Sequence, residues 1–388
     1  MSFKLELLPP DATLPHLLLY EGYLLTIKHS NVSFTGRTAN ISPDFLKKTL
    51  ESLDDELVDS LKVNFTGNDM KPIKSLITSL IGSVPKGKLG ALRYVLKALK
   101  DEASKITVNR DIRVFPLKTK DGILYDLKDK KSGISLQLLK VDRYTGIGSL
   151  ESGNFSKQVT TYYSPEAALL VLLGVASAYS TTFRSGDKVY YYLVTFTPGQ
   201  VAEIISSGKK EIVERYLAVK DEVKEVVAQV MARYPSNELL IMELMLNLKL
   251  SESLIKNDIE KADFLLIKLA SEGQTYKIYE QIPLTVVKEP PFYRTSDNPE
   301  KLRSALWKII NPEESKLVWS VASIGRASQK PEANNALRAL LYLYRFVVLG
   351  DPQGLLEFTR ELSSCYRVCE ASNGKGCELY LYYLRLLQ

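Results

Sequence analysis

The chain has 388 residues, which is enough for two or three domains with hydrophobic cores of their own. Hydrophobic residues make up 45% and charged residues 25% of it, the composition of a soluble globular protein. The longest apolar run, residues 167–178, is too short to cross a bilayer, which needs roughly 20 residues, and the N-terminus lacks the layout of a secretion signal. From these features we expect a cytoplasmic protein that neither spans a membrane nor is secreted, and that has no membrane partner.

The net charge of +6 is unevenly distributed along the chain. Residues 71–143 contain 17 Lys and Arg against 7 Asp and Glu, a net +10, which leaves −4 for the remainder. A block of one sign attracts polyanions, because each basic group can replace a condensed counterion on a phosphate backbone. The alternative is a lysine-rich face that is merely solvated. The size of the block favours the first interpretation.

Short strands and a helix are predicted at the start of the chain. Residues 2–8, 16–29 and 31–36 carry β-branched or aromatic side chains between Pro, Gly and Asn, and we predict strands there. A helix is predicted from Ser42, as its N-cap, to Leu61, because Pro43 suits a first helical turn.

The basic block itself begins with helical patterns on both sides of a break at residues 82–88, within residues 71–100. Strand patterns follow, separated by Asp-Gly and Ser-Gly turns, at 106–118, 122–128 and 134–144. We therefore expect residues 1–160 to form a β-rich basic region that binds nucleic acid.

Residues 161–290 read as a mixed α/β region. A buried helix is predicted over 165–179 with Ser164 as its N-cap, followed by a loop at 181–187 and a strand over 188–198.

Helical patterns then occupy residues 198–234 and 236–250, and residues 275–288 look extended again. The tandem prolines Pro290 and Pro291 favour stiff extended chain and mark a linker.

The last region, residues 291–388, is predicted to be a helical bundle. Helices open at Asn298-Pro299, Asn311-Pro312 and Lys330-Pro331, and Gly350 ends the third of them. Two further helical patterns follow, at 354–362 and 378–387. The expected fold class is α+β, with a β-rich N-terminal part that carries a basic helix, a mixed middle region and a C-terminal helical bundle.

Residues 82–89 nearly match the nucleotide-binding loop G-x-x-x-x-G-K-[ST]. Leu89 stands where a Ser or Thr hydroxyl would hold magnesium, and Pro85 removes one backbone donor from the cradle. The segment before the loop reads as helix, whereas a phosphate loop follows a strand. The stretch therefore indicates a binding platform rather than an NTPase.

Lysines of this stretch have a spacing that suits an anion. Lys86 and Lys88 flank Gly87 at a predicted helix start, where free N–H groups and the helix dipole favour negative charge. Further along, basic side chains share one face of the helix, opposite a row of leucines: Arg93, Lys97 and Lys100. This basic stripe is suited to a nucleic-acid backbone, and the alternative is a helix that exposes lysines to water.

Candidates for chemistry are few. His16 and His29 lie in predicted strands without a metal-ligand cluster beside them. Cys365, Cys369 and Cys377 fit three states: a zinc site completed by another ligand, a disulfide, or free thiols. No catalytic motif is recognisable, so we expect no enzyme and no cofactor.

Tyrosines are abundant, with 22 in the chain. On a strand, Tyr190 and Tyr192 face one side and Tyr191 the other. One of these faces is then core, and the other either offers a stacking platform for a base or is core as well, with hydroxyls that reach water.

The order of these regions, and residues 320–362 in particular, "SVASIGRASQKPEANNALRALLYLYRFVVLGDPQGLLEFTREL", resemble the large-subunit family of archaeal type I-A CRISPR interference (Cascade) complexes. The likeness covers roughly residues 280–362 and is loose elsewhere. The family has no compact catalytic motif, so the match rests on pattern. A cysteine metal site found in some related large subunits is not carried over, because the three cysteines here lie near the C-terminus.

This resemblance implies a non-catalytic subunit that binds the 5′ end of a guide RNA, recognises the protospacer-adjacent motif in double-stranded target DNA, and recruits the helicase–nuclease beside other Cascade subunits. It implies backbone contacts for Lys86, Lys88, Arg93, Lys97 and Lys100. DNA contacts near the bundle are expected for Arg326, Lys330 and Arg338, and motif reading for Arg184 and Lys188. The alternatives are a guide-independent replication, repair or viral nucleic-acid-binding protein, and a nucleotide-binding enzyme that uses residues 82–89.

Overall fold

The computed structural model confirms an α+β fold. It describes residues 3–6, 13–30, 32–35, 38–106, 108, 112–113, 116–119, 122–125, 133–144 and 161–387. The chain divides into two compact units, unit 1 with Met1–Ala218 and Asp263–Leu284, and unit 2 with Val219–Ala262 and Thr285–Gln388. This division does not follow the three consecutive regions of the sequence analysis, because a long hairpin returns residues 263–284 to the sheet of unit 1.

Unit 1 begins with a small sheet in the order β2-β3-β1-β4. Its strands are β1 (Phe3–Glu6), β2 (Val32–Thr35), β3 (Thr38–Ile41) and β4 (Ile112–Arg113). β1 pairs antiparallel with β3 and parallel with β4. The strands predicted at 2–8 and 31–36 are confirmed.

The strand predicted over residues 16–29 is wrong, since this segment is helix α1 (Leu14–His29). The helix is buried along nearly its whole length and around its circumference, so its sequence shows neither a helical nor a strand period. A continuous apolar run is ambiguous between a buried strand and a buried helix, and its length of 16 residues favoured the helix.

α1 packs against α6 (Pro165–Ala178), the buried helix that the sequence predicted. Ser164 caps α6 as expected, because its side chain accepts a hydrogen bond from the backbone N–H of Ala167. The two backbones touch where Gly22 meets Gly174: an added Cβ would lie 2.0 Å from Leu170 O at Gly22 and 1.7 Å from Leu18 O at Gly174. Only glycine fits at this crossing.

Four helices follow, α2 (Phe45–Glu51), α3 (Asp55–Ser60), α4 (Met70–Ile81) and α5 (Leu92–Asp101). The single helix predicted from Ser42 to Leu61 is therefore two helices. The break lies at residues 52–54, where Asp54 starts α3 by accepting a hydrogen bond from Glu56 N. The helices predicted on both sides of residues 82–88 are confirmed as α4 and α5.

The largest sheet of unit 1 has the order β11-β10-β9-β8. Its strands are β8 (Tyr179–Ser185), β9 (Lys188–Phe196), β10 (Lys261–Glu272) and β11 (Thr275–Val287). The predictions of β9 and β11 are confirmed. The loop predicted at 181–187 is wrong, because residues 179–185 pair with β9 and only the turn around Gly186 is left, where a φ of +57° suits glycine.

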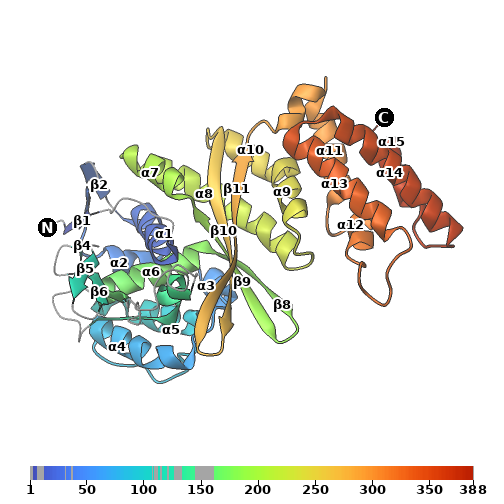
Figure 1. Ribbon diagram of the computed structural model, residues 1–388. Coiled ribbons are helices and arrows are strands. Elements are labelled where there is room, and N and C mark those ends of the chain that lie inside the picture. The colour runs from blue at the N-terminus through green and yellow to red at the C-terminus, as the bar shows by residue number, and fades with distance from the viewer. Residues whose placement is uncertain are drawn as a thin grey trace. The chain divides into compact units, whose positions relative to one another are not determined.

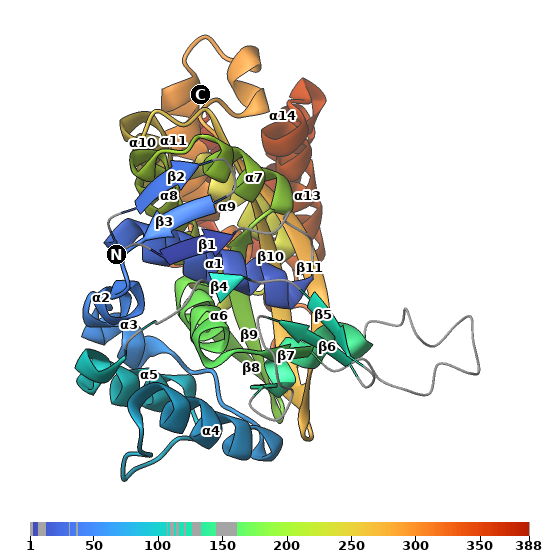
Figure 2. The same ribbon diagram turned by 90° about the vertical axis from the view of Figure 1, so that its left-hand side faces the viewer.

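A third sheet has the order β5-β6-β7, with β5 (Pro116–Thr119), β6 (Gly122–Tyr125) and β7 (Thr161–Tyr163). The strand predicted over 134–144 is mostly wrong: Ile134 forms a bridge to Tyr163, but Gln137–Tyr144 are a 3-10 helix. Figure 2 shows these strands and α1 to α6 in unit 1.

Helices predominate in the rest of the chain (Figure 1). They begin with α7 (Pro198–Ser206), α8 (Lys210–Met231) and α9 (Asn237–Leu246), which lie within segments predicted helical. α10 (Leu248–Lys256) follows, and only its residues 248–250 fall in a predicted helix. The predicted linker after Glu289 continues as a short 3-10 helix, Pro291–Thr295.

The C-terminal bundle of unit 2 is confirmed. It contains α11 (Pro299–Ile310), α12 (Lys316–Val321), α13 (Ala333–Leu349), α14 (Pro352–Ala371) and α15 (Glu378–Leu386). Asn298 caps α11 as expected, whereas Ser315, not Asn311, caps α12. Gly350 ends α13 with a φ of +67°.

Two buried polar side chains hold α11 against the junction of α9 and α10. Arg303 is 1% exposed and donates to the carbonyls of Leu246 and Asn247, which end α9. Glu243 is 2% exposed, and its Oε1 accepts from Trp307 Nε1 at 2.6 Å. Burial raises the pKa of Glu243, although hydrogen bonds from Trp307 and Asn247 act in the opposite direction.

The glycine crossing predicts a large effect from one methyl group. Gly174→Ala should lower the free energy of unfolding by about 3 kcal/mol or more, because the new Cβ overlaps the backbone of Leu18 and forces α1 and α6 apart. Gly199→Ala, in α7, is the matched control: its Cβ meets nothing within 4 Å, and the change should be neutral or stabilising by up to about 1 kcal/mol. Urea unfolding of both variants measures the difference, and equal stabilities would contradict the close crossing.

The buried carboxyl predicts a pH-dependent gain of stability. Because the pKa of Glu243 is raised in the folded chain, its contribution is most favourable below the pKa of an unfolded Glu, about 4.3, and is lost as pH rises through the folded value. Glu243→Gln should therefore raise the urea midpoint at about pH 7.5 and leave it nearly unchanged at about pH 4. Glu252→Gln, on the exposed surface of α10, should show no such gain. A higher urea midpoint of Glu243→Gln at the lower pH only would contradict a raised pKa of Glu243.

Candidate nucleic-acid interface

The most basic stretch that the structure describes runs from α4 through a loop into α5. From Met70 to Lys100 the chain has seven Lys and Arg and no Asp or Glu. The loop leaves α4 at Gly82, whose φ of +81° ends the helix. It returns to the segment before α4, because Phe65 N donates to Gly90 O and Leu92 N donates to Val63 O, each at 2.9 Å. The loop thus spans the length of α4.

Lys86 and Lys88 lie in this loop and are exposed. Neither forms an ion pair with any residue that the structure describes. Their predicted place at a helix start is wrong, because α5 begins only at Leu92, with Ala91 as an N-cap that offers no side-chain acceptor. The dipole of α5 therefore does not act at Lys86 and Lys88 in the way expected from the sequence.

The loop also lacks the geometry of a nucleotide-binding loop. It follows helix α4 rather than a strand, as the sequence indicated. Leu89, at the position of the magnesium-binding hydroxyl, is 8% exposed and part of the core. The side chain of Leu89 has no oxygen that could bind a magnesium ion.

Two further lysines on α4 were not singled out from the sequence. Lys71 and Lys74 are exposed and have no ion pair within the described part of the chain, while Ile73, Leu76 and Ile77 bury the opposite face of α4. The absence of any acidic residue from 70 to 100 was the signal that would have found them. We call Lys71, Lys74, Lys86 and Lys88 the open lysines.

The basic stripe of α5 exists but is not free. Leucines and Val95 bury one face of α5, and the basic residues lie on the other, as predicted. However, Lys97 Nζ lies 2.5 Å from Asp59 Oδ1, and Lys100 Nζ lies 2.6 Å from Asp55 Oδ1. The hydrogen bond with Asp59 raises the pKa of Lys97, and the one with Lys100 lowers the pKa of Asp55. The sequence did not show that α3 places its carboxylates there.

Arg93, the third member of the stripe, has a different environment. It is half-buried, lies over the ring of Tyr94 at 4.9 Å from the centroid, and donates to the Tyr94 hydroxyl at 3.2 Å. No described carboxylate pairs with it. The guanidinium is therefore held in place with its charge uncompensated.

The two residues at the β8–β9 turn also differ from each other. Lys188 Nζ lies 3.0 Å from Glu272 Oε1 and 2.8 Å from the Tyr279 hydroxyl, and these hydrogen bonds raise its pKa. Arg184 is exposed and has no ion pair with a described residue. Of the pair, only Arg184 is available for a new anion.

The tyrosines of β9 mostly belong to the core. Tyr191 is 2% exposed and Tyr192 1%, so both faces of the strand are covered there and a broad stacking platform is wrong. Tyr190 is half-buried, with Lys268 Nζ 4.9 Å from its ring centroid and the Tyr279 ring edge-on at 5.2 Å. Tyr191 and Tyr192 therefore fit the interpretation as core residues.

In unit 2, Arg326 and Lys330 are exposed on the loop between α12 and α13. The loop is held by its own hydrogen bonds: Gly325 N donates to Gln329 Oε1, and Lys330 N donates to Ser323 Oγ. Neither basic side chain has an ion pair in the described residues. Arg338, by contrast, pairs with Glu361 at 3.3 Å.

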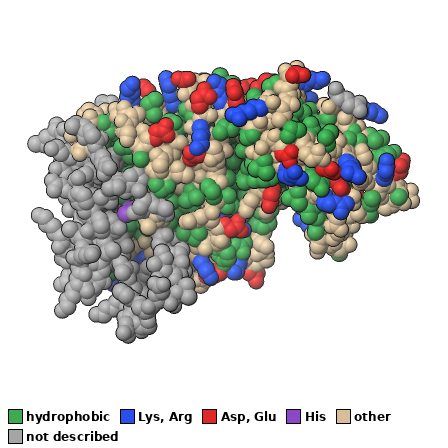
Figure 3. Space-filling view, turned by 45° about the horizontal axis from the view of Figure 1, so that its top comes forward, with side chains coloured by type: hydrophobic (Ala, Val, Ile, Leu, Met, Phe, Trp, Pro, Cys, Tyr) green, Lys and Arg blue, Asp and Glu red, His purple; other side chains and the backbone are tan. Residues whose placement is uncertain are grey.

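Charges of both signs are mixed on the face of the molecule in Figure 3. There, Lys and Arg side chains alternate with Asp and Glu, and no large patch of one sign covers the described residues in view. On this face, positive charge is therefore interspersed with negative charge.

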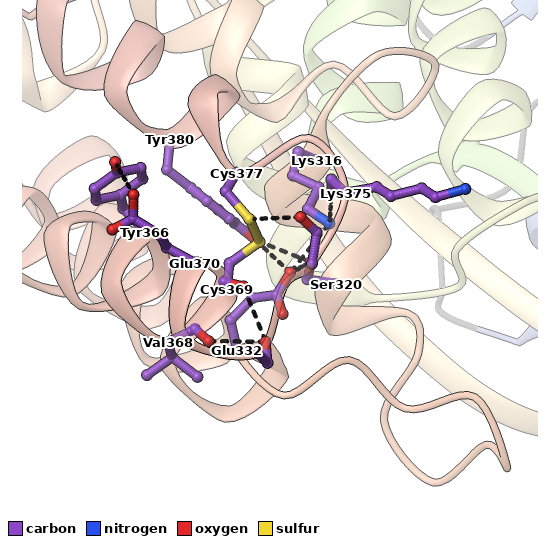
Figure 4. Close-up of a disulfide and its surroundings, with 12 residues drawn as sticks. Lys316, Ser320, Glu332, Tyr366, Val368, Cys369, Glu370, Lys375, Cys377 and Tyr380 are labelled. Carbon is purple, nitrogen blue, oxygen red and sulfur yellow. Dashed lines mark hydrogen bonds and ion pairs between the residues drawn. A yellow bond between two sulfur atoms is a disulfide. The ribbon is translucent and has the colours of Figure 1, made fainter.

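Of the three states that the sequence left open for the cysteines, the structure shows the disulfide. Cys369, near the end of α14, and Cys377, just before α15, are bonded to each other (Figure 4). Cys365 is a buried free thiol, and burial raises its pKa to about 12. A zinc site made by all three thiolates is excluded while this bond is present. The described residues contain no group of three or more His, Cys, Asp or Glu that could hold a metal ion. His16 and His29 both lie on α1, not on strands.

None of the helices in the described residues is long and apolar enough to span a membrane. The most apolar one, α6, has 14 residues and is covered by the rest of unit 1.

The disulfide predicts a stability that depends on reductant. Cys377→Ser should lower the free energy of unfolding of unit 2 by about 2 to 3 kcal/mol, because the bond closes a short loop between α14 and α15. The wild-type chain in dithiothreitol should match this variant, and the variant itself should not respond to dithiothreitol. Urea unfolding followed in both conditions makes the comparison, and a wild type that ignores the reductant would contradict a structural role for the bond.

Comparison with known proteins gives a relative but no described function. No protein-family model matches the chain, and no solved structure matches it. A protein of Archaeoglobus fulgidus that bears the name "Uncharacterized protein" is 36% identical to it over 399 residues, an alignment that covers 100% of this chain and 99% of the archaeal one. Because the likeness extends over both chains from end to end, this chain belongs to the same protein family as the Archaeoglobus fulgidus protein.

Proposed function

We propose that this chain binds nucleic acid without catalysing a reaction, as the large subunit of an archaeal type I-A CRISPR interference complex. One observation carries the binding part: the open lysines are exposed on α4 and its following loop, and none of them has an acidic partner in the described residues. A stretch of 31 residues without a single carboxylate around them leaves their charge uncompensated along the chain.

The chemistry of lysine fits a phosphate backbone. Each ammonium is a compact charge on a flexible stem, which can approach a phosphate oxygen from many directions. Binding releases the counterions condensed on the nucleic acid, so affinity grows with the number of lysines in contact and falls with salt. Contacts of this kind position a strand but do not read its bases.

The RNA-guided part rests on the resemblance of residues 280–362 to the large-subunit family. In such complexes base pairing with the guide reads the sequence, and the protein grips backbones and a short motif. The proposed partners are the guide RNA 5′ end, double-stranded target DNA, the other Cascade subunits and the helicase–nuclease. Arg326 and Lys330 on their exposed loop suit a contact to duplex DNA, and Arg184 at the β8–β9 turn suits the adjacent motif.

The open lysines predict a specific loss of binding. Lys86→Ala/Lys88→Ala should weaken binding of the purified chain to duplex DNA and to guide RNA, and should make the dependence of log K on log salt shallower by about 2, one for each lysine. Lys47→Ala/Lys48→Ala removes the same charge from lysines that are already paired, with Glu51 and Asp44, and should have a smaller effect. Fluorescence anisotropy over a salt series measures both.

Three results would contradict the proposal at different levels. Equal losses in the two double variants would mean that net charge, and not the open lysines, controls binding. Purification from archaeal cells without small RNA or partner subunits would favour a guide-independent nucleic-acid-binding protein. Magnesium-dependent ATP binding that Lys88→Ala abolishes would restore the nucleotide-binding alternative.

A further inference from the structure

The carboxylates of α3 lie against the basic stripe of α5 in a regular arrangement. α3 has the sequence Asp-Glu-Leu-Val-Asp-Ser, and its two aspartates are four residues apart, on one side of the helix. Lys97 and Lys100 of α5 are three residues apart, also on one side. The pairs match one to one: Asp59 with Lys97 at 2.5 Å, and Asp55 with Lys100 at 2.6 Å.

The carboxylates are the outer members of these pairs. The side chain of Asp55 is 76% exposed, while that of Lys100 is 22% exposed. The difference is smaller but has the same sign for Asp59, at 58%, and Lys97, at 44%. An incoming polyanion therefore meets the carboxylates before the lysines.

The lysines are also anchored differently. Lys100 Nζ donates to the backbone carbonyl of Leu53 at 2.6 Å as well as to Asp55, so it stays in place when the carboxylate leaves. Lys97 has Asp59 as its acceptor among the described residues. Both carboxylates are the kind of surface partner that salt screens and that another oxyanion can replace.

From this geometry we propose that Asp55 and Asp59 occupy positions that phosphates of a nucleic-acid backbone can take, so that Lys97 and Lys100 form a second contact surface which α3 keeps weak. The inference rests on the proposed function, since it concerns the same nucleic acid that the open lysines hold. It adds that Asp55 and Asp59 limit the affinity for nucleic acid. When a phosphate replaces a carboxylate, each lysine still has one anionic partner, so the free energy of binding gains only from the release of counterions.

The two surfaces are connected by the chain. The loop with Lys86 and Lys88 leads directly into α5, which starts at Leu92 and carries Lys97 in its second turn. A nucleic-acid strand bound by the open lysines therefore lies next to the N-terminal end of α5, where the basic stripe starts. The expected order is binding at the loop first, followed by displacement of the α3 carboxylates.

The test removes the carboxylates and keeps the lysines. Asp55→Asn/Asp59→Asn should bind a fluorescein-labelled DNA duplex roughly tenfold more tightly than the wild-type chain at about 0.1 M salt, which corresponds to one further phosphate contact. The slope of log K against log salt should steepen by about 1 to 2. Addition of Lys97→Ala/Lys100→Ala to this variant should abolish the gain. The same two lysine changes in the wild-type background leave both carboxylates of α3 without their lysines and should weaken binding.

Glu222→Gln/Glu225→Gln is the matched control. It changes the net charge by the same amount and also releases a surface lysine, Lys249, which lies 3.0 Å from Glu222 and 2.7 Å from Glu225. It should leave the affinity within about twofold of the wild type if position matters and not charge alone. Asp54, the N-cap of α3, is kept in all variants, and the single change Asp59→Asn, which preserves the Asp55–Lys100 pair, provides a second variant if the double one fails to fold.

The outcomes separate this inference from the proposed function. An Asp55→Asn/Asp59→Asn affinity equal to that of the wild type, or a gain that the control matches, or one that survives loss of both lysines, overturns the role of α3 while DNA binding by the open lysines still stands. Absence of salt-dependent DNA binding in the wild type and in every variant overturns the proposed function and this inference together.

Discussion

The contact between two backbones at Gly22 and Gly174 controls the arrangement of unit 1. Because neither helix has a side chain at the crossing, α1 and α6 approach until carbonyl oxygens fill the space of the missing Cβ atoms. Glu21, next to the crossing, is 1% exposed and accepts hydrogen bonds from Phe196 N and from the Ser177 hydroxyl. One carboxylate thus joins the helix pair to the end of β9, so the large sheet and the two central helices are fixed as one body. Of the helices that carry the basic residues, α4 packs on α6, and α5 packs on α2, α3 and α4.

The electrostatics of unit 1 depends on which basic residues form ion pairs with carboxylates in the folded chain. The stretch from residue 70 to residue 100 contains seven Lys and Arg and no Asp or Glu, so its order of residues does not distinguish free from paired basic side chains. In the fold, α3 lies beside α5 and neutralises Lys97 and Lys100, while the loop after α4 lies beyond the reach of any described carboxylate. The distinction between a free and a compensated lysine decides which of them can exchange a counterion for a phosphate.

Unit 2 is held by a different kind of contact, buried polar groups that join helices far apart in sequence. Arg303 of α11 satisfies the last carbonyls of α9, and in the bundle Lys316 pairs with Glu332 at 3.1 Å beneath the Cys369–Cys377 bond. Figure 4 shows that Ser320 and Tyr380 complete this network. Such groups are costly to bury unless every partner is present, so they specify one packing of the helices. The exposed loop with Arg326 and Lys330 begins and ends on that framework.

The sequence by itself determined the elements whose signals are local: the cap and buried character of α6, the strands β1, β2, β9 and β11, the bundle helices with their Asn298 cap and Gly350 end, and the two faces of α5. It also identified the lysines of the loop at 82–88 and the absence of a magnesium-binding hydroxyl at Leu89. Tertiary structure alone decided that residues 16–29 are a helix, since a segment buried on all sides has no period to read. It alone decided that Lys97, Lys100, Lys188 and Arg338 have carboxylate partners, because those partners are 23 to 84 residues away in the chain. Ion pairs between distant segments follow from packing, and packing of this kind leaves no pattern in the order of residues.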